Sequence, residues 1–189
     1  MREKFFLLPF MKKIKERDND AASKNDPPLQ KGKTNALIWL RLSLFVIVLD
    51  QLSKIWASAT LELQQLVAVL DFFDLTLLHN YGAAFGFLGT AEGWQRWFLS
   101  ILAIVISGVI VIWLSRVKRQ QWWLACALAL VLGGALGNVL DRIMYGYVVD
   151  FIDIYYQQWH WPAFNIADSA ISIGAVMLLI DALRGNAER

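Results

Sequence analysis

Four long apolar segments constrain the fold of this 189-residue chain more than any other feature. They run over residues 36–57, 95–114, 122–140 and 164–184. Each is close to the roughly 20 residues that a helix needs to cross a hydrocarbon layer. The second and third carry no charge from Trp97 to Leu114 and from Trp122 to Leu140. With 57% hydrophobic residues, the chain is too apolar for a soluble domain of this size. The sequence therefore predicts a membrane all-α protein with four transmembrane helices.

Residues 1–35 have a different composition, with nine Lys or Arg and five Asp or Glu around a stretch punctuated by Pro and Gly. We expect a disordered tail here and a membrane domain over residues 36–189. Basic residues concentrate in the tail, in the 115–121 turn and at the C-terminal end. The positive-inside rule then places both termini in the cytoplasm and the loops 58–94 and 141–163 outside. The net charge of +2 gives no basis for a nucleic-acid partner.

The outer loop 58–94 is too long to be a simple turn. Its stretch DFFDLTLLHNYGAAFGFLGT mixes β-branched and aromatic residues with Gly, which predicts a small β-rich structure on the outer face. Residues 61–70 have a second interpretation, a short interfacial helix. We see no internal repeat along the chain.

Polar residues gather at the outer ends of the third and fourth segments. If the third helix continues past Leu140, Asn138, Asp141 and Arg142 share one of its faces. The same face carries Gly133, Gly134 and Gly137, a spacing that permits close approach of another helix. In the fourth segment a matching polar stripe contains Asn165, Asp168, Ser169 and Ser172. The two stripes should meet at the same membrane depth.

Asp150 lies between these stripes, among the apolar residues of YGYVVDFIDIYY. We expect an extended segment at the membrane interface that brings its carboxylate toward Asp168. A carboxylate in a bilayer is costly and is rarely kept without a partner or a task. Two carboxylates in one semi-dry site hold a single proton between them because the pKa of one is pushed up. Such a pair can activate water for peptide hydrolysis without a metal.

Other charged residues have plain structural interpretations. Asp50 and Lys54, at positions i and i+4, predict a helix-end salt bridge. Asp141 and Arg142 could form an interfacial ion pair that fixes a loop. Arg41 is expected to reach the cytoplasmic headgroups, and Asp153 and Asp181 to be solvated charges at the ends of spans.

Five motifs together resemble those of the lipoprotein signal peptidases, the type II signal peptidases of bacteria. They are DQLSK (50–54), NYGAAFG (80–86), GNVLDR (137–142), VVDFI (148–152) and FNIADS (164–169). Each motif alone would be a weak signal. Their order along the chain, on a scaffold with four spans, makes the match highly specific.

The resemblance implies an aspartic endopeptidase of the bacterial inner membrane, with its active site near the outer face. Such an enzyme removes signal peptides from prolipoproteins by cutting before a diacylglyceryl-modified cysteine, and the cyclic peptide globomycin inhibits it. The catalytic pair would be Asp150 and Asp168. The residues that hold substrate or inhibitor would be Asn80, Asn138, Arg142 and Asn165, with structural support from Asp141, Asp50 and Lys54. We expect a monomer that contacts membrane lipid and needs no cofactor or metal.

Three other functions remain open from the residues alone. A proton-coupled transporter or small channel would also place acids among membrane helices, although nearer mid-membrane. A metalloenzyme could recruit Asp141, Asp150, Asp168 and His160, although the chain has no HExxH motif. A non-catalytic membrane scaffold would tolerate Asp150→Asn.

Overall fold

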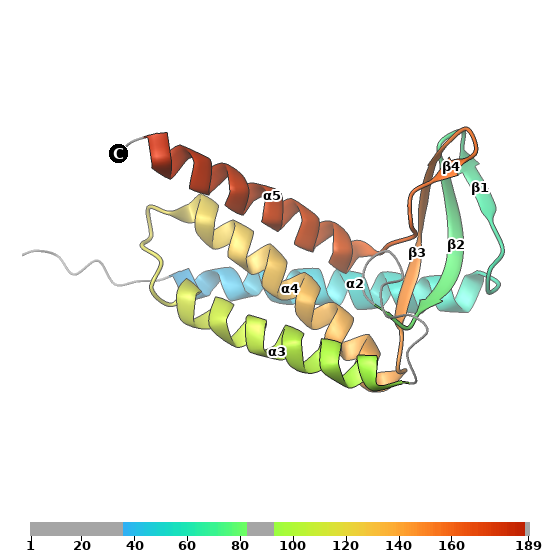
Figure 1. Ribbon diagram of the computed structural model, residues 1–189, viewed down its shortest axis with the longest axis horizontal. Coiled ribbons are helices and arrows are strands. Elements are labelled where there is room, and N and C mark those ends of the chain that lie inside the picture. The colour runs from blue at the N-terminus through green and yellow to red at the C-terminus, as the bar shows by residue number, and fades with distance from the viewer. Residues whose placement is uncertain (1–35, 83–92, 188–189) are drawn as a thin grey trace, which may run out of the picture. The chain divides into compact units, whose positions relative to one another are not determined.

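The computed structural model describes residues 36–82 and 93–187. The predicted tail and part of the NYGAAFG motif lie outside the described residues. Four long helices confirm the four-helix prediction, and each is long and apolar enough to cross a membrane (Figure 1). They are α2 (Leu40–Thr60), α3 (Trp94–Leu114), α4 (Trp122–Met144) and α5 (Ile166–Ala187), with a short 3-10 helix, η1 (Ala36–Trp39), leading into α2.

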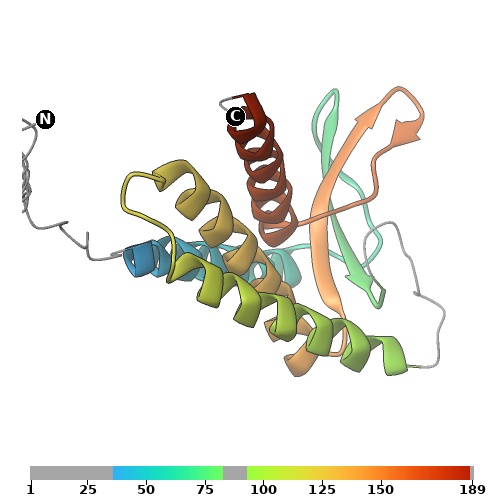
Figure 2. The ribbon, with the colours of Figure 1, turned by 60° about the vertical axis from the view of Figure 1, so that its left-hand side comes forward.

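Helix α4 is the central element of the bundle. In its most apolar stretch 61% of the residues are buried, against 22% in the span that contains α2, 22% in α3 and 17% in α5. It packs against α2, α3 and α5, and Figures 1 and 2 show it between α3 and α5. The three outer helices instead expose large apolar side chains, such as Phe45, Ile101 and Leu179. These faces are suited to contact lipid.

Glycines on α4 explain how closely its neighbours approach. A methyl group at Gly134 would collide with the carbonyl oxygen of Ala167 in α5. At Gly133 it would lie 2.8 Å from the carbonyl oxygen of Ser43 in α2. The prediction that this face of the third helix permits close approach is confirmed, and the approach brings the first turn of α5 against α4 and α2.

One end of the bundle carries a four-stranded antiparallel sheet in the order β1-β2-β3-β4. Its strands are β1 (Val67–Leu70), β2 (Phe73–Asn80), β3 (Val148–Tyr156) and β4 (Trp159–His160). Gly146 turns the chain from α4 into β3 with a positive φ of 89°, which glycine adopts without strain. The predicted β-rich structure is therefore present, and Asp150 lies on an extended segment as expected.

The alternative of an interfacial helix over residues 61–70 is wrong. Val67–Leu70 forms the edge strand β1, which pairs with β2, and Leu63 bridges to Leu77. Two β-branched valines favour a strand here, and pairing with β2 satisfies backbone groups along one side of this segment.

Candidate active site

A cavity of about 970 Å³ opens between α3, α4, α5 and the sheet. Its walls are mainly apolar, with Leu102 and Ile106 from α3 and Ile171 from α5. Its polar end contains five of the residues singled out in the sequence: Asn80, Asn138, Arg142, Asp150 and Asp168. The structure therefore brings the two aspartates to one cavity from elements that are distant along the chain.

Asp168 is positioned by the start of helix α5. The Asn165 side chain accepts a hydrogen bond from the backbone N–H of Asp168 (2.9 Å), and the Asp168 carboxylate accepts one from the N–H of Asn165 (3.3 Å). This reciprocal pair is a capping box, which satisfies N–H groups that the first turn of a helix leaves free. Asn138 Nδ2 also donates to Asp168 Oδ1 at 2.8 Å.

Asp150 is held from the sheet and from α5. It lies opposite Leu78 in the β2–β3 ladder, and its side chain is only 3% exposed. Asn80 Nδ2 donates to Asp150 Oδ2 at 3.0 Å, and Asn165 Nδ2 donates to Asp150 Oδ1 at 2.7 Å. Asn165 therefore contacts both aspartates and sets their separation.

The environment of Asp150 makes it a weak acid. Burial, and secondly the charge of Asp168, raise the pKa of Asp150 from 3.8 to about 7. Hydrogen bonds from Asn80 and Asn165 and the charge of Lys54 act in the opposite direction and are weaker. Near neutral pH the pair can therefore hold one proton between the two carboxyl groups.

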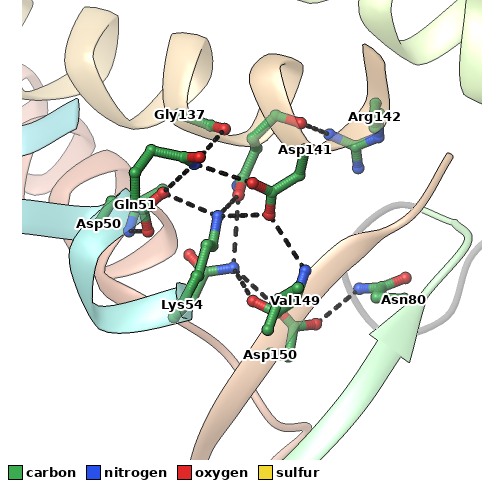
Figure 3. A network of polar contacts seen from close by, with 12 residues as sticks. Asp50, Gln51, Lys54, Asn80, Gly137, Asp141, Arg142, Val149 and Asp150 are labelled. Carbon is green, nitrogen blue, oxygen red and sulfur yellow. Dashed lines mark hydrogen bonds and ion pairs between the residues drawn. The ribbon is translucent and has the colours of Figure 1, made fainter. Parts of the chain in front are cut away.

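A buried network behind the aspartates joins α2 to α4 (Figure 3). Lys54 Nζ lies 2.8 Å from Asp50 Oδ2, which confirms the predicted salt bridge, and 2.8 Å from Asp141 Oδ2. Asp50 Oδ1 accepts the N–H of Ala167 at 2.8 Å. Asp141 also accepts the N–H of Val149 at 3.1 Å. Asp50 thus ties the first turn of α5 to α2, and Asp141 ties the start of β3 to α4.

The expected pairing of Asp141 with Arg142 is wrong, because consecutive residues of a helix point in different directions. Asp141 points toward α2, whereas Arg142 lines the cavity. One Arg142 nitrogen donates to the carbonyl oxygen of Gly82 at 2.9 Å. Among the described residues its buried Nε has no hydrogen-bond partner.

Asp153 also differs from expectation. Asp153 is buried, not solvated, because β3 lies between β2 and β4 in the sheet, and its carboxylate lies 2.7 Å from His160 Nδ1. Neither residue lines the cavity. Within the described part of the chain, no group of three or more Asp, Glu, His or Cys residues is arranged to hold a metal ion.

Two residues of the site region were missed in the sequence. His79 lines the cavity and stacks on Tyr147, with ring centroids 3.8 Å apart; burial lowers the pKa of His79. Gln51 Nε2 donates to Asp141 Oδ1 at 2.8 Å. Gln51 lies within the DQLSK motif, so the motif itself was the available signal.

Four apolar helices, three of which line a cavity with paired carboxylates, define a multi-pass membrane protein with a polar site at one end of the bundle. The sequence profile of signal peptidase II matches residues 42–184. The lipoprotein signal peptidase of Pseudomonas fluorescens strain Pf0-1 is 55% identical over 152 residues, covering 79% of this chain and 89% of the relative. That of Pseudomonas aeruginosa strain UCBPP-PA14 is 55% identical over 150 residues, covering 78% and 89%. The chain belongs to the signal peptidase II family.

A solved structure described as a bacterial membrane enzyme has the same fold. It superposes with a TM-score of 0.73 at 31% identity and covers 80% of this chain and 91% of that one. A second, described in the same words, has a TM-score of 0.68 at 32% identity and covers 77% and 92%. Family membership makes the protein a membrane peptidase.

Proposed function

We propose that the protein removes signal peptides from diacylglyceryl-modified prolipoproteins, cutting before the lipidated cysteine, with Asp150 and Asp168 as the catalytic pair. The observation that carries this proposal is the convergence of both carboxylates on one end of an otherwise apolar cavity. The named relatives are lipoprotein signal peptidases, and this supports the choice of substrate.

The two aspartates have different tasks in the proposed reaction. Asp168, ionised at the start of α5, takes a proton from a water molecule that attacks the scissile carbonyl carbon. Asp150, protonated, donates to the carbonyl oxygen as the tetrahedral intermediate forms. When the C–N bond breaks, the amine of the cysteine receives the proton held by Asp168. The new carboxyl group forms as the intermediate returns a proton to Asp150, which restores both carboxyl groups to their starting states.

The surrounding polar residues suit a peptide backbone. The buried Nε–H of Arg142, which has no partner among the described residues, is a donor for a substrate carbonyl group. Asn80, Asn138 and Asn165 hold the aspartates and offer amide groups at the same end of the cavity. The apolar walls between α3 and α5 suit a lipid-attached substrate that arrives from the side, within the bilayer.

The membrane setting completes the proposal. We place the protein as a monomer in the bacterial inner membrane, with both termini cytoplasmic and the sheet outside, and residues 1–35 as a cytoplasmic tail preceding the peptidase domain of residues 36–189. No cofactor or metal has a role in the proposed reaction. Globomycin, a cyclic peptide, would compete for the same cavity.

The test is cleavage of a purified diacylglyceryl prolipoprotein by the purified protein in detergent or lipid. We expect the wild type to release the signal peptide, globomycin to stop the release, and Asp150→Asn and Asp168→Asn to give none. Asp153→Asn is the matched control, since it changes a buried aspartate on the same strand outside the cavity; it should cleave. Undiminished cleavage by either of the first two variants would refute the assignment of the pair.

A further inference from the structure

We propose that Lys54 is a positioning residue for the reaction: its ammonium group fixes the orientation of the Asn138 amide and, through that amide, the Asp168 carboxylate. This inference rests on the proposed function and goes beyond a salt bridge that holds two helices together. It assigns a catalytic consequence to a side chain that does not line the main cavity.

The contacts of Lys54 account for all of its donors. Its side chain is 3% exposed, and Nζ lies 2.8 Å from Asp50, 2.8 Å from Asp141 and 2.9 Å from Asn138 Oδ1. An ammonium group has three N–H bonds and no acceptor. Two of them neutralise buried aspartates and would suffice for a structural ion pair. The third N–H bond reaches the Asn138 side chain, which in turn donates to Asp168.

The polarity of this third contact carries the inference. A side-chain amide can present either its oxygen or its NH₂ group in a given direction. Because Lys54 can only donate, Asn138 must turn its oxygen toward it. Asn165 Nδ2 donates to the same oxygen at 3.3 Å. The Asn138 NH₂ group must then face Asp168, to which it donates at 2.8 Å. The reversed amide would set NH₂ against ammonium and oxygen against carboxylate.

A second effect of Lys54 is electrostatic and can be measured separately. The positive charge of Lys54 lowers the pKa of Asp150, although burial and Asp168 raise it further. Removal of the charge should therefore move the pKa of Asp150 upward. An uncharged residue that only held α2 against α4 would not shift this titration.

The experiment is a double-mutant cycle measured as signal-peptide release from the diacylglyceryl prolipoprotein. Lys54→Met should lower kcat by about 10- to 100-fold, as expected for a misplaced catalytic group, with KM little changed. In the Asn138→Ala background the same substitution should cost much less, because the contact through which Lys54 acts is already gone. Asn80→Ala is the matched control. Asn80 holds Asp150 from β2, whereas Lys54 bonds Asn138, Asp50 and Asp141. In the Asn80→Ala background, Lys54→Met should therefore lower kcat by the same factor as in the wild type.

The alkaline limb of the pH–rate profile gives the second readout. In Lys54→Met it should move to higher pH, whereas Lys54→Arg, which keeps the charge, should leave it nearly in place. Equal costs of Lys54→Met with and without Asn138, together with an unmoved alkaline limb, would overturn the inference while the proposed function stands. Failure of the wild type to cleave would instead refute the proposed function.

The same variants are tested for correct folding. Lys54→Met leaves Asp50 and Asp141 without their cation, which is a severe change for buried carboxylates. If this variant does not fold, the cycle is repeated with Lys54→Met/Asp141→Asn as the starting protein, because the second change removes one of the two uncompensated charges. Thermal unfolding of each purified variant shows which proteins enter the comparison.

Discussion

Replacement of Asp150 by Asn should stabilise the protein, and the gain should grow with pH. The pKa of Asp150 is raised from 3.8 to about 7 in the folded protein. Below about pH 4 the carboxyl group is protonated in both the folded and the unfolded state, so its ionisation does not lower the free energy of unfolding. Between about pH 4 and pH 7 the unfolded chain loses the proton while the folded protein keeps it, so stability falls as pH rises. Above about pH 7 Asp150 is ionised in both states, and the free energy of unfolding falls no further on its account.

The size of the effect follows from the same pKa. At about 1.4 kcal/mol for each tenfold change, the ionised form costs roughly 4 kcal/mol at alkaline pH. The amide introduced by Asp150→Asn avoids this cost but loses one hydrogen bond with Asn80 or Asn165, worth about 1 kcal/mol. The expected net gain is therefore about 3 kcal/mol at pH 8. For a chain of this size that corresponds to a rise in Tm of roughly 6–12 °C.

The assay is thermal unfolding of wild type and Asp150→Asn in one detergent, followed by tryptophan fluorescence at about pH 4.5 and at about pH 8. The difference in Tm should be small at the lower pH and several degrees at the higher. Asp71→Asn is the control, because Asp71 is an exposed acid in the turn between β1 and β2; the difference in Tm between this variant and the wild type should not grow. A variant that is no more stable than wild type at pH 8 would refute the reasoning.

Three further outcomes are expected. The plot of kcat/KM against pH should fall on its alkaline side near pH 7, where Asp150 loses the proton that the proposed reaction requires; a flat profile up to pH 9 would contradict this. Gly134→Ala should lower stability by about 1–3 kcal/mol, because the added methyl group meets the carbonyl oxygen of Ala167, whereas Gly108→Ala, with open space around it, should not; equal Tm values would refute the clash. Activity should survive a strong chelator, and a loss that added zinc restores would favour the metalloenzyme alternative.

Much of the fold could be predicted because the length of an apolar segment and the composition of a loop are local signals. Four apolar segments gave four helices, and the mixed composition of loop 58–94 gave strands. The predicted Asp50–Lys54 pair was also local, since positions i and i+4 face each other on one helix. Asp150 and Asp168 were found as candidates because each is an acid among apolar residues.

The partners of these residues could not be predicted in the same way. Lys54 and Asn138 are 84 residues apart and meet only when α2 packs on α4. Helical spacing tells which residues share a face but not which neighbour that face meets. For that reason Arg142 was considered as the partner of Asp141, although Asp141 pairs with Lys54. Asp153 was expected in solvent because alternation along a strand does not say which face is covered.

The position of the site follows from the cost of charge in a membrane protein. A carboxylate near the bilayer needs donors, and a helix interior has none to spare because its N–H groups bond within the helix. The first turn of α5 does have free N–H groups, and those of Ala167 and Asp168 bond Asp50 and Asn165. The hydrogen bonds that cap the start of α5 thus also position Asp150 and Asp168. Substitutions of Asn165 should therefore reduce stability and cleavage together, whereas Asp150→Asn should separate them.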